Sequence, residues 1–156
     1  MRLIIAYLTV FLAALLYAVY ADLAELLPAW LSSQASAFRC VIAGGFGGLL
    51  YLTRAIYINR AVKKQWDSSW HVWYYLRPAA SLMSGGVAYL FLSAGLLVLG
   101  AEARSEGGSL GFTALAFIAG LNVDRFIEKV EDLAQAAWGI KKSRSSSDST
   151  SSRESQ

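Results

Sequence analysis

The sequence is poor in the residues that build reactive sites and cross-links. Its 156 residues include one cysteine, Cys40, one histidine, His71, and two prolines. One cysteine cannot form an internal disulfide framework, and with one histidine it cannot make a cysteine/histidine metal cage. No Ser/His/Asp triad, paired carboxylates or metal-ligand spacing is visible. We therefore expect no enzyme, with no catalytic, metal-binding or cofactor-binding residue, and interpret His71 as a ring at a membrane interface.

Charge is scarce as well. Only 16% of the residues are charged, against about 25% in a typical soluble domain. No Asp, Glu, Lys or His lies near the centre of any hydrophobic block, which argues against a proton relay, an ion-coupled carrier or a pump. The composition also fits poorly with intrinsic disorder, a coiled coil or a soluble enzyme. We expect the lipid bilayer as a partner, and no nucleic acid.

What the sequence has instead is apolar residues, 56% of the chain, with a mean hydropathy of +0.43. They gather in four blocks, at residues 3–21, 37–58, 79–101 and 109–123. The first would make a helix of about 28 Å, close to the ~30 Å hydrocarbon thickness of a bilayer. The fourth is short, and Pro78 fits the first turn of the third. The sequence therefore predicts an all-α integral membrane protein with four transmembrane helices.

The distribution of Lys and Arg predicts the orientation of these spans. Twelve of the 14 basic residues fall in the amino terminus, the loop after the second span, which includes Arg77, and the carboxyl-terminal segment. The loop 22–38 contains none. Because Lys and Arg are retained in the cytoplasm, both termini are predicted to be cytoplasmic. Residues 1–21 also fit a cleaved signal peptide; cleavage would leave the other three spans in the same orientation.

Several residues are candidates for anchors at the membrane surface. Arg39 and Arg54 border the second span, and their side chains can extend outward to opposite headgroup layers. Trp66, Trp70 and Trp73 share one face of a possible short helix, and tryptophan favours the headgroup region. We interpret this stretch as a helix on the inner membrane surface, with a partner-binding patch as the alternative.

Glycines are concentrated inside two of the predicted spans. The second contains Gly44, Gly45, Gly47 and Gly48, and the third begins with Gly85 and Gly86 near Ser81 and Ser84. Small residues four apart let helix backbones approach closely in lipid. A phosphate-binding loop does not fit, because no strand precedes the glycines and no Lys-Ser/Thr follows them. We interpret all six glycines as helix-packing residues, either within one chain or between subunits.

An amphipathic helix is predicted to follow the fourth span, over residues 123–139. Its apolar residues recur at steps of three and four, and its opposite face is charged. This helix could pack on its own chain or the membrane, bundle with copies of itself, or bind another protein. Asn122 and Asp124 could line the inner mouth of a ring-shaped oligomer or act as helix caps. The serine-rich tail, residues 141–156, is predicted to be disordered.

The order of motifs in the second half resembles that of a set of small bacterial inner-membrane proteins of uncharacterised function. An aromatic-Arg-Pro entry ending at Pro78 is followed by a Leu-rich span, a short Ala/Gly span and an amphipathic helix beginning near Asp124. The resemblance covers residues 70–135 only. It implies a bacterial inner-membrane protein and brings across no reaction and no catalytic residue.

Two functions are consistent with these features. The first is a homo-oligomeric membrane protein whose cytoplasmic helix 123–139 aids assembly, as a gated pore or a membrane effector. The second is a non-conducting membrane anchor or sensor that works with a separately encoded partner protein.

Overall fold

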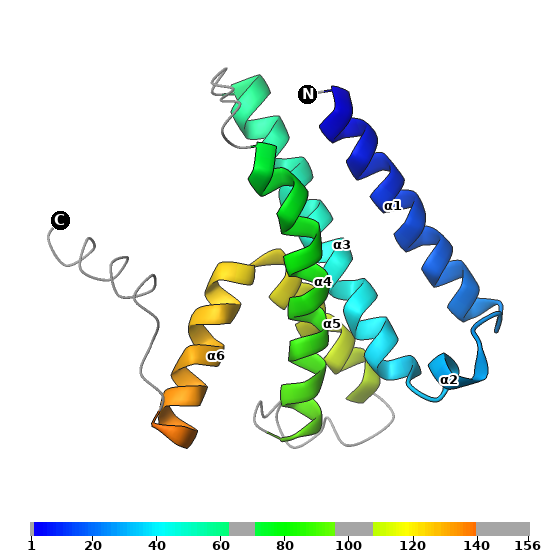
Figure 1. Ribbon diagram of the computed structural model, residues 1–156, viewed down its shortest axis with the longest axis vertical. Coiled ribbons are helices and arrows are strands. Elements are labelled where there is room, and N and C mark those ends of the chain that lie inside the picture. The colour runs from blue at the N-terminus through cyan, green and yellow to red at the C-terminus, as the bar shows by residue number, and fades with distance from the viewer. Residues whose placement is uncertain (1, 63–70, 96–107, 140–156) are drawn as a thin grey trace, which may run out of the picture. The chain divides into compact units, whose positions relative to one another are not determined.

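The computed structural model describes residues 2–62, 71–95 and 108–139, and every regular element in these ranges is a helix (Figure 1). The all-α part of the prediction is therefore confirmed. The helices are listed here in chain order: α1 (Arg2–Leu23), α2 (Ala29–Ser32), α3 (Ala35–Tyr57), the π-helix η1 (Ile58–Val62), α4 (His71–Ser93), α5 (Gly108–Leu121) and α6 (Val123–Trp138).

Two helical stretches in the described ranges are long and apolar enough to cross a membrane, Arg2–Leu23 and Ala35–Val62. A third results if the pair Leu110–Leu121 and Val123–Ala136 is counted as one broken span. The first two correspond to the predicted spans 3–21 and 37–58. The described structure therefore supplies two, or up to three, candidate spans where the sequence predicts four.

Helix α3 forms the centre of the bundle, since it packs against both α4 and α5 and also carries α1. Its buried positions are rich in small residues, including the glycines of the predicted packing face. In contrast, α1 buries a single stripe of residues, Ile4, Leu8, Leu15 and Ala21. Most other residues of α1 are apolar and exposed, such as Leu3 at 77% and Val10 at 68%, while Tyr7, Phe11, Ala18 and Val19 are partly buried against the core. A helix that is apolar on all sides and buried on one is suited to a lipid environment.

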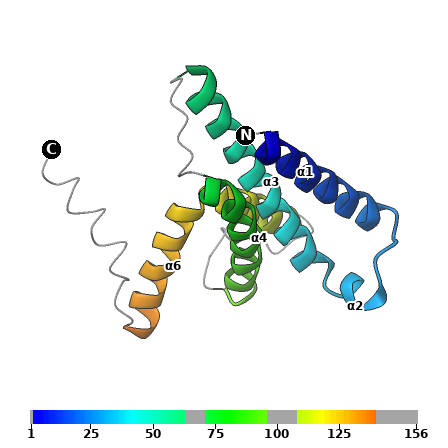
Figure 2. The ribbon, with the colours of Figure 1, turned by 45° about the horizontal axis from the view of Figure 1, so that its top comes forward.

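The chain reverses direction at each connection between the long helices of this bundle. In Figure 1, α1 and α4 run one way, and α3 and α5 run the other. Figure 2 shows α1 beside α3, in agreement with the contacts between them. Arg2, at the start of α1, and Arg54, in the last turn of α3, therefore lie at the same end of this antiparallel pair.

Helix α4 differs from the predicted third span, residues 79–101. It begins at His71, so Pro78 lies inside the helix instead of in its first turn, and it ends at Ser93. Gly95, with φ +71°, follows this end. The earlier start has a packing reason, because Tyr74 and Arg77 are buried against other helices. Residues 96–101 of the predicted span lie outside the described ranges.

The end of the chain is organised as a second unit. The chain divides by contacts into Met1–Val123 and Asp124–Gln156, whereas the sequence predicted one membrane domain over 1–140. Helix α5 ends at Leu121, two residues before the end of the predicted span 109–123. Helix α6 ends at Trp138, one residue before the predicted 139, and Gly139 follows with φ +68°. The predicted disordered tail, residues 141–156, lies outside the described ranges.

Candidate functional site: a glycine seam and a buried arginine

Three helices meet where glycines remove the side chains between them. A Cβ atom built on Gly44 of α3 would lie 2.5 Å from the carbonyl oxygen of Ser81 and 2.8 Å from the Cα of Gly85, both on α4. A Cβ on Gly120 of α5 would lie 2.6 Å from the Cα of Gly44. These contacts are with backbone atoms, which cannot move aside as a side-chain end can. We call Gly44, Gly47, Gly85 and Gly120 the glycine seam, together with Gly48, on which a Cβ would meet the side chain of Ser81 and, at 3.6 Å, the carbonyl oxygen of Gly120.

The other glycines of the predicted set have different surroundings. A Cβ on Gly45 would meet side-chain atoms, at 2.8 Å from Leu82 and 2.9 Å from Leu15. A Cβ on Gly86 would meet only a methyl of Val41, at 3.4 Å, an ordinary contact. Gly120 was missed as a packing residue, although it stands four residues after the small, fully buried Ala116. That spacing was the signal that could have identified it.

The faces of the seam glycines are covered by atoms of the same chain. Gly47 faces the carbonyl oxygen of Phe117, and Gly85 faces that of Cys40. A face already occupied by its own chain is not open to a second copy. Any contact between copies therefore has to use other surfaces.

A serine links two helices of the seam. The Oγ of Ser81 lies 2.9 Å from the carbonyl oxygen of Arg77 in its own helix and 3.1 Å from that of Gly120 in α5. Its hydroxyl proton can be donated to either oxygen. Ser81 is fully buried, so this interhelical hydrogen bond has no water to replace it.

Replacing Ser81 by alanine is expected to destabilise the bundle by about 1 kcal/mol, the typical contribution of an interhelical hydrogen bond in a membrane. Thermal unfolding in detergent would measure the change. Ser84→Ala is the matched control, because the Ser84 hydroxyl donates only to Ala80 of its own helix. Equal melting temperatures for the two variants would contradict a role for the Ser81 bond.

A second feature of the bundle is a buried arginine. Arg77 is only 5% exposed, although the sequence places it among the basic residues of a loop. Its guanidinium carbon lies 4.7 Å from the ring centroid of Tyr51 and 5.5 Å from that of Trp73. Both are cation–π distances. An ionisable side chain buried among apolar helices is costly, and it marks a candidate functional site in a membrane protein.

Aromatic and polar neighbours complete the surroundings of Arg77. The ring of Trp73 contacts those of Tyr51 and Tyr74 edge to face, at 5.7 Å and 5.1 Å between centroids. Tyr74 is fully buried, and its hydroxyl accepts a long hydrogen bond of 3.5 Å from the side-chain amide of Asn59 on η1. π-Helical turns occur often at functional sites. We call Tyr51, Asn59, Trp73, Tyr74 and Arg77 the arginine cluster.

The predicted membrane anchors lie in three different settings. Arg39 pairs with Asp22 at the end of α1, with Nε 2.7 Å and Nη2 3.3 Å from the two carboxylate oxygens. Arg54 is exposed in the last turn of α3. Trp73 is half-buried in the arginine cluster. Trp66 and Trp70 lie outside the described ranges, so the predicted surface helix stays a prediction.

Asn122 and Asp124 flank the start of α6. Asn122 is the break between α5 and α6, and its backbone N–H donates to the carbonyl oxygen of Ile118 at 3.0 Å. Asp124 lies in the first turn of α6, where a carboxylate is favoured by the positive end of the helix dipole. Both side chains are exposed. Their role at an inner mouth stays a prediction.

Within the described residues, no group of three or more His, Cys, Asp or Glu side chains lies close enough to hold a metal ion. What the described residues bring together is close backbone packing at the glycine seam and a desolvated positive charge among aromatic rings. Comparisons with protein-family models, with curated proteins and with solved structures found no match to the chain. The resemblance over residues 70–135 stays a prediction.

Proposed function

We propose that this chain is a multi-pass protein of the bacterial inner membrane with four transmembrane helices and both termini in the cytoplasm. Two helices that are long and apolar enough to span a bilayer support the proposal, as do the reversals of direction from α1 to α5. The shared end of Arg2 and Arg54 fits a cytoplasmic side rich in positive charge. Helix α5, with 14 residues, would reach about 21 Å and require a locally thinned bilayer.

We further propose that the protein works as a homo-oligomer assembled through α6. The observation that carries this proposal is the apolar stripe of α6, in which the buried Val123 is followed by the half-buried Phe126, Val130 and Leu133 at steps of three, four and three. This is the a/d spacing of helices that pair along their length. A helix of only two heptads pairs weakly when it is isolated in water. Copies tethered to one membrane meet at a high effective concentration, which favours pairing.

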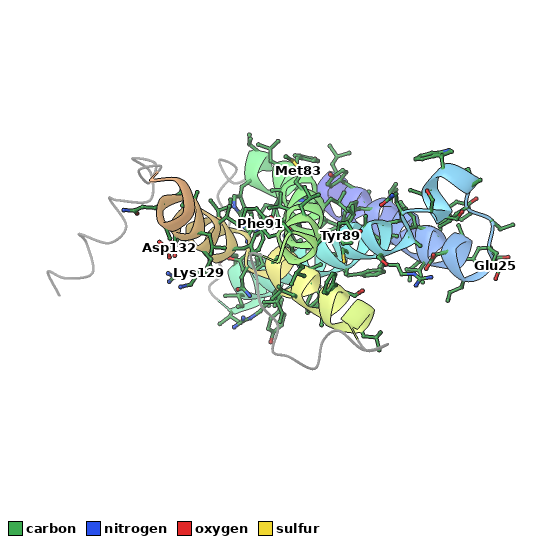
Figure 3. All side chains as sticks on the ribbon, turned by 90° about the horizontal axis from the view of Figure 1, so that it is seen from below. Glu25, Met83, Tyr89, Phe91, Lys129 and Asp132 are labelled. Carbon is green, nitrogen blue, oxygen red and sulfur yellow. The ribbon has the colours of Figure 1, made fainter. Side chains whose placement is uncertain are left out.

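The charges of α6 favour a protein partner over adsorption on anionic lipid. The helix carries four acidic and two basic residues, a net charge of −2, so the negative inner leaflet repels it. Both basic residues pair within the helix: Arg125 with Glu128 at 3.0 Å, and Lys129 with Asp132 at 3.8 Å. Figure 3 shows Lys129 and Asp132 together on α6. The basic residues of the polar face are thus paired within the helix, which leaves the half-buried Phe126, Val130 and Leu133 for association.

Replacing Val130 by aspartate is expected to reduce the oligomer to single chains. The substitution puts a charge in the middle of the apolar stripe, where pairing would desolvate it at a cost of several kcal/mol. The mass of the detergent-solubilised complex, measured by light scattering, would report the change. The matched control is Gln135→Asp, because Gln135 is exposed and outside the stripe. A wild-type protein that is monomeric at all concentrations, or a Val130→Asp protein that keeps its mass, would overturn assembly through α6.

The activity of such an oligomer is proposed to be a gated pore or a membrane-perturbing effector. Since the glycine seam fills the interior of the chain with backbone contacts, a conducting path would have to run between copies. Ion flux in liposomes that contain the wild-type oligomer, lost on Val130→Asp, would support a pore. Absence of flux would favour the second function, a non-conducting anchor or sensor whose separately encoded partner is lost on deleting residues 124–139.

A further inference from the structure

An apolar groove of about 270 Å³ lies between α1 and α3. This volume is just below the ~300 Å³ of the smallest common ligand pockets. From Ile5 to Leu12 the groove follows α1 for about 10 Å. Its apolar lining comes from both helices, with Ile5, Leu8 and Leu12 on α1 and Leu49 and Ile56 on α3.

The two remaining lining residues, Thr9 and Thr53, keep the groove apolar in effect. The Thr9 hydroxyl donates to the carbonyl oxygen of Ile5 at 2.9 Å, and the Thr53 hydroxyl donates to that of Leu49, also at 2.9 Å. Each hydroxyl therefore has its partner in its own helix and needs none from a ligand. A narrow, elongated hydrocarbon fits such a lining better than a polar molecule does.

Positive charge lies at one end of this groove. Arg2 is three residues before Ile5, and so on the same face of α1. Arg54 follows Thr53 on α3 and lies about 100° around the helix from it, so its long side chain has to extend along the helix surface to reach the groove. Both arginines are exposed, and the antiparallel helices bring them to the same end of the pair. Exposed arginine at the membrane surface attracts the phosphate of an anionic lipid.

We propose that this groove is a binding site for one anionic phospholipid of the inner leaflet. The part of one acyl chain nearest the headgroup lies between α1 and α3, and the headgroup phosphate lies at Arg2 and Arg54. The site accounts for the loose packing of α1, which buries only one stripe of its surface. The inference rests on the proposed insertion of α1 and α3 in the membrane with Arg2 on its cytoplasmic side. It does not depend on α6 or on the oligomeric state.

Native mass spectrometry of the full-length protein tests the site. The protein is purified in detergent with equal amounts of dioleoyl phosphatidylglycerol, which is anionic, and dioleoyl phosphatidylcholine, which carries no net charge. We expect one phosphatidylglycerol per chain. Arg2→Gln or Arg54→Gln is each expected to reduce the preference for phosphatidylglycerol about fivefold, the usual effect of one basic residue near anionic lipid. Arg125→Gln, a loss of one positive charge on α6, is the matched control.

A second pair of variants tests the groove itself. Thr9→Phe fills the groove and is expected to lower the occupancy of both lipids about tenfold, because the acyl chain is excluded sterically. Leu16→Phe adds an aromatic ring to the exposed surface of α1 outside the groove, and is expected to change nothing. Circular dichroism would verify that both variants keep their helix content.

The outcomes separate this inference from the proposed function. Equal occupancy in Thr9→Phe and Leu16→Phe would overturn the groove as the site. Equal binding of the two lipids, unaffected by the arginine variants, would overturn the role of Arg2 and Arg54. Either result would leave membrane insertion and assembly through α6 standing. A protein that is released from membranes without detergent would instead overturn the proposed function, and this inference with it.

Discussion

Replacing Gly44 by alanine is expected to destabilise the protein by about 3 kcal/mol or more, at the upper end of what overpacking costs in a well-packed core. The added methyl would meet the Ser81 carbonyl oxygen at 2.5 Å and the Gly85 Cα at 2.8 Å, and Gly120 presses on Gly44 from the other side. This clash can be relieved only if the backbones of α3, α4 and α5 move apart, because rotating a side chain does not create the space. Thermal unfolding followed by size-exclusion chromatography in detergent would measure the loss of folded protein.

The matched control is Gly86→Ala, one helix away in the same bundle. Its new methyl would meet only the Val41 side chain, at 3.4 Å. Alanine is favoured over glycine inside a helix by about 1 kcal/mol, so Gly86→Ala is expected to raise the melting temperature slightly. The two Gly→Ala changes therefore have opposite expected signs. A Gly44→Ala protein as stable as the Gly86→Ala protein would contradict the close approach of the three helices.

The helical class was predictable because it follows from composition and run length alone. The apolar runs of α1 and α3 exceed what a soluble helix requires, and the described helices Arg2–Leu23 and Ala35–Tyr57 match those predictions to within two residues at each end. Helix α4 was harder. A proline is tolerated best in the first turn of a helix, so local preference put the start at Ala79. The burial of Tyr74 and Arg77 against α3 and η1 is a tertiary effect that no local pattern reveals.

The candidate site was predictable in part, because spacing along the sequence shows which residues share a helix face. Spacing places Gly44 and Gly48 on one face of α3, and both lie in the glycine seam. It could not distinguish Gly45, which faces side chains, from its neighbours, because the distinction depends on where α4 and α5 cross α3. The sequence placed Arg77 in a basic loop and could not predict its burial, because the aromatic rings that contact its guanidinium come from two helices. Trp73 is close to Arg77 in sequence, but Tyr51 is 26 positions away.

Replacing Arg77 by alanine is expected to destabilise the protein by about 3 kcal/mol, within the range for truncating a large buried side chain. Two losses contribute. The cation–π contacts with Tyr51 and Trp73 disappear, each a desolvated contact of about 1 to 2 kcal/mol, and loss of the buried aliphatic stem leaves an unfilled space. Removing the charge also removes the free-energy cost of burying it, and this gain opposes the two losses. The opposing effect is small for arginine, since its guanidinium is weakly hydrated compared with an ammonium group.

A second substitution separates the two contributions. Arg77→Met keeps most of the volume and removes the guanidinium with its charge and polar contacts, so its destabilisation should fall between that of Arg77→Ala and the wild type. Arg77→Lys should not restore full stability, because a compact ammonium does not stack on two rings as the planar guanidinium does.

Arg54→Ala is the matched control, since Arg54 is exposed in the last turn of α3. Thermal unfolding in detergent, with near-ultraviolet circular dichroism to follow the packing of the aromatic residues, would compare these variants. If Arg77→Ala were as stable as Arg54→Ala, the arginine cluster would contribute nothing to the stability of the fold.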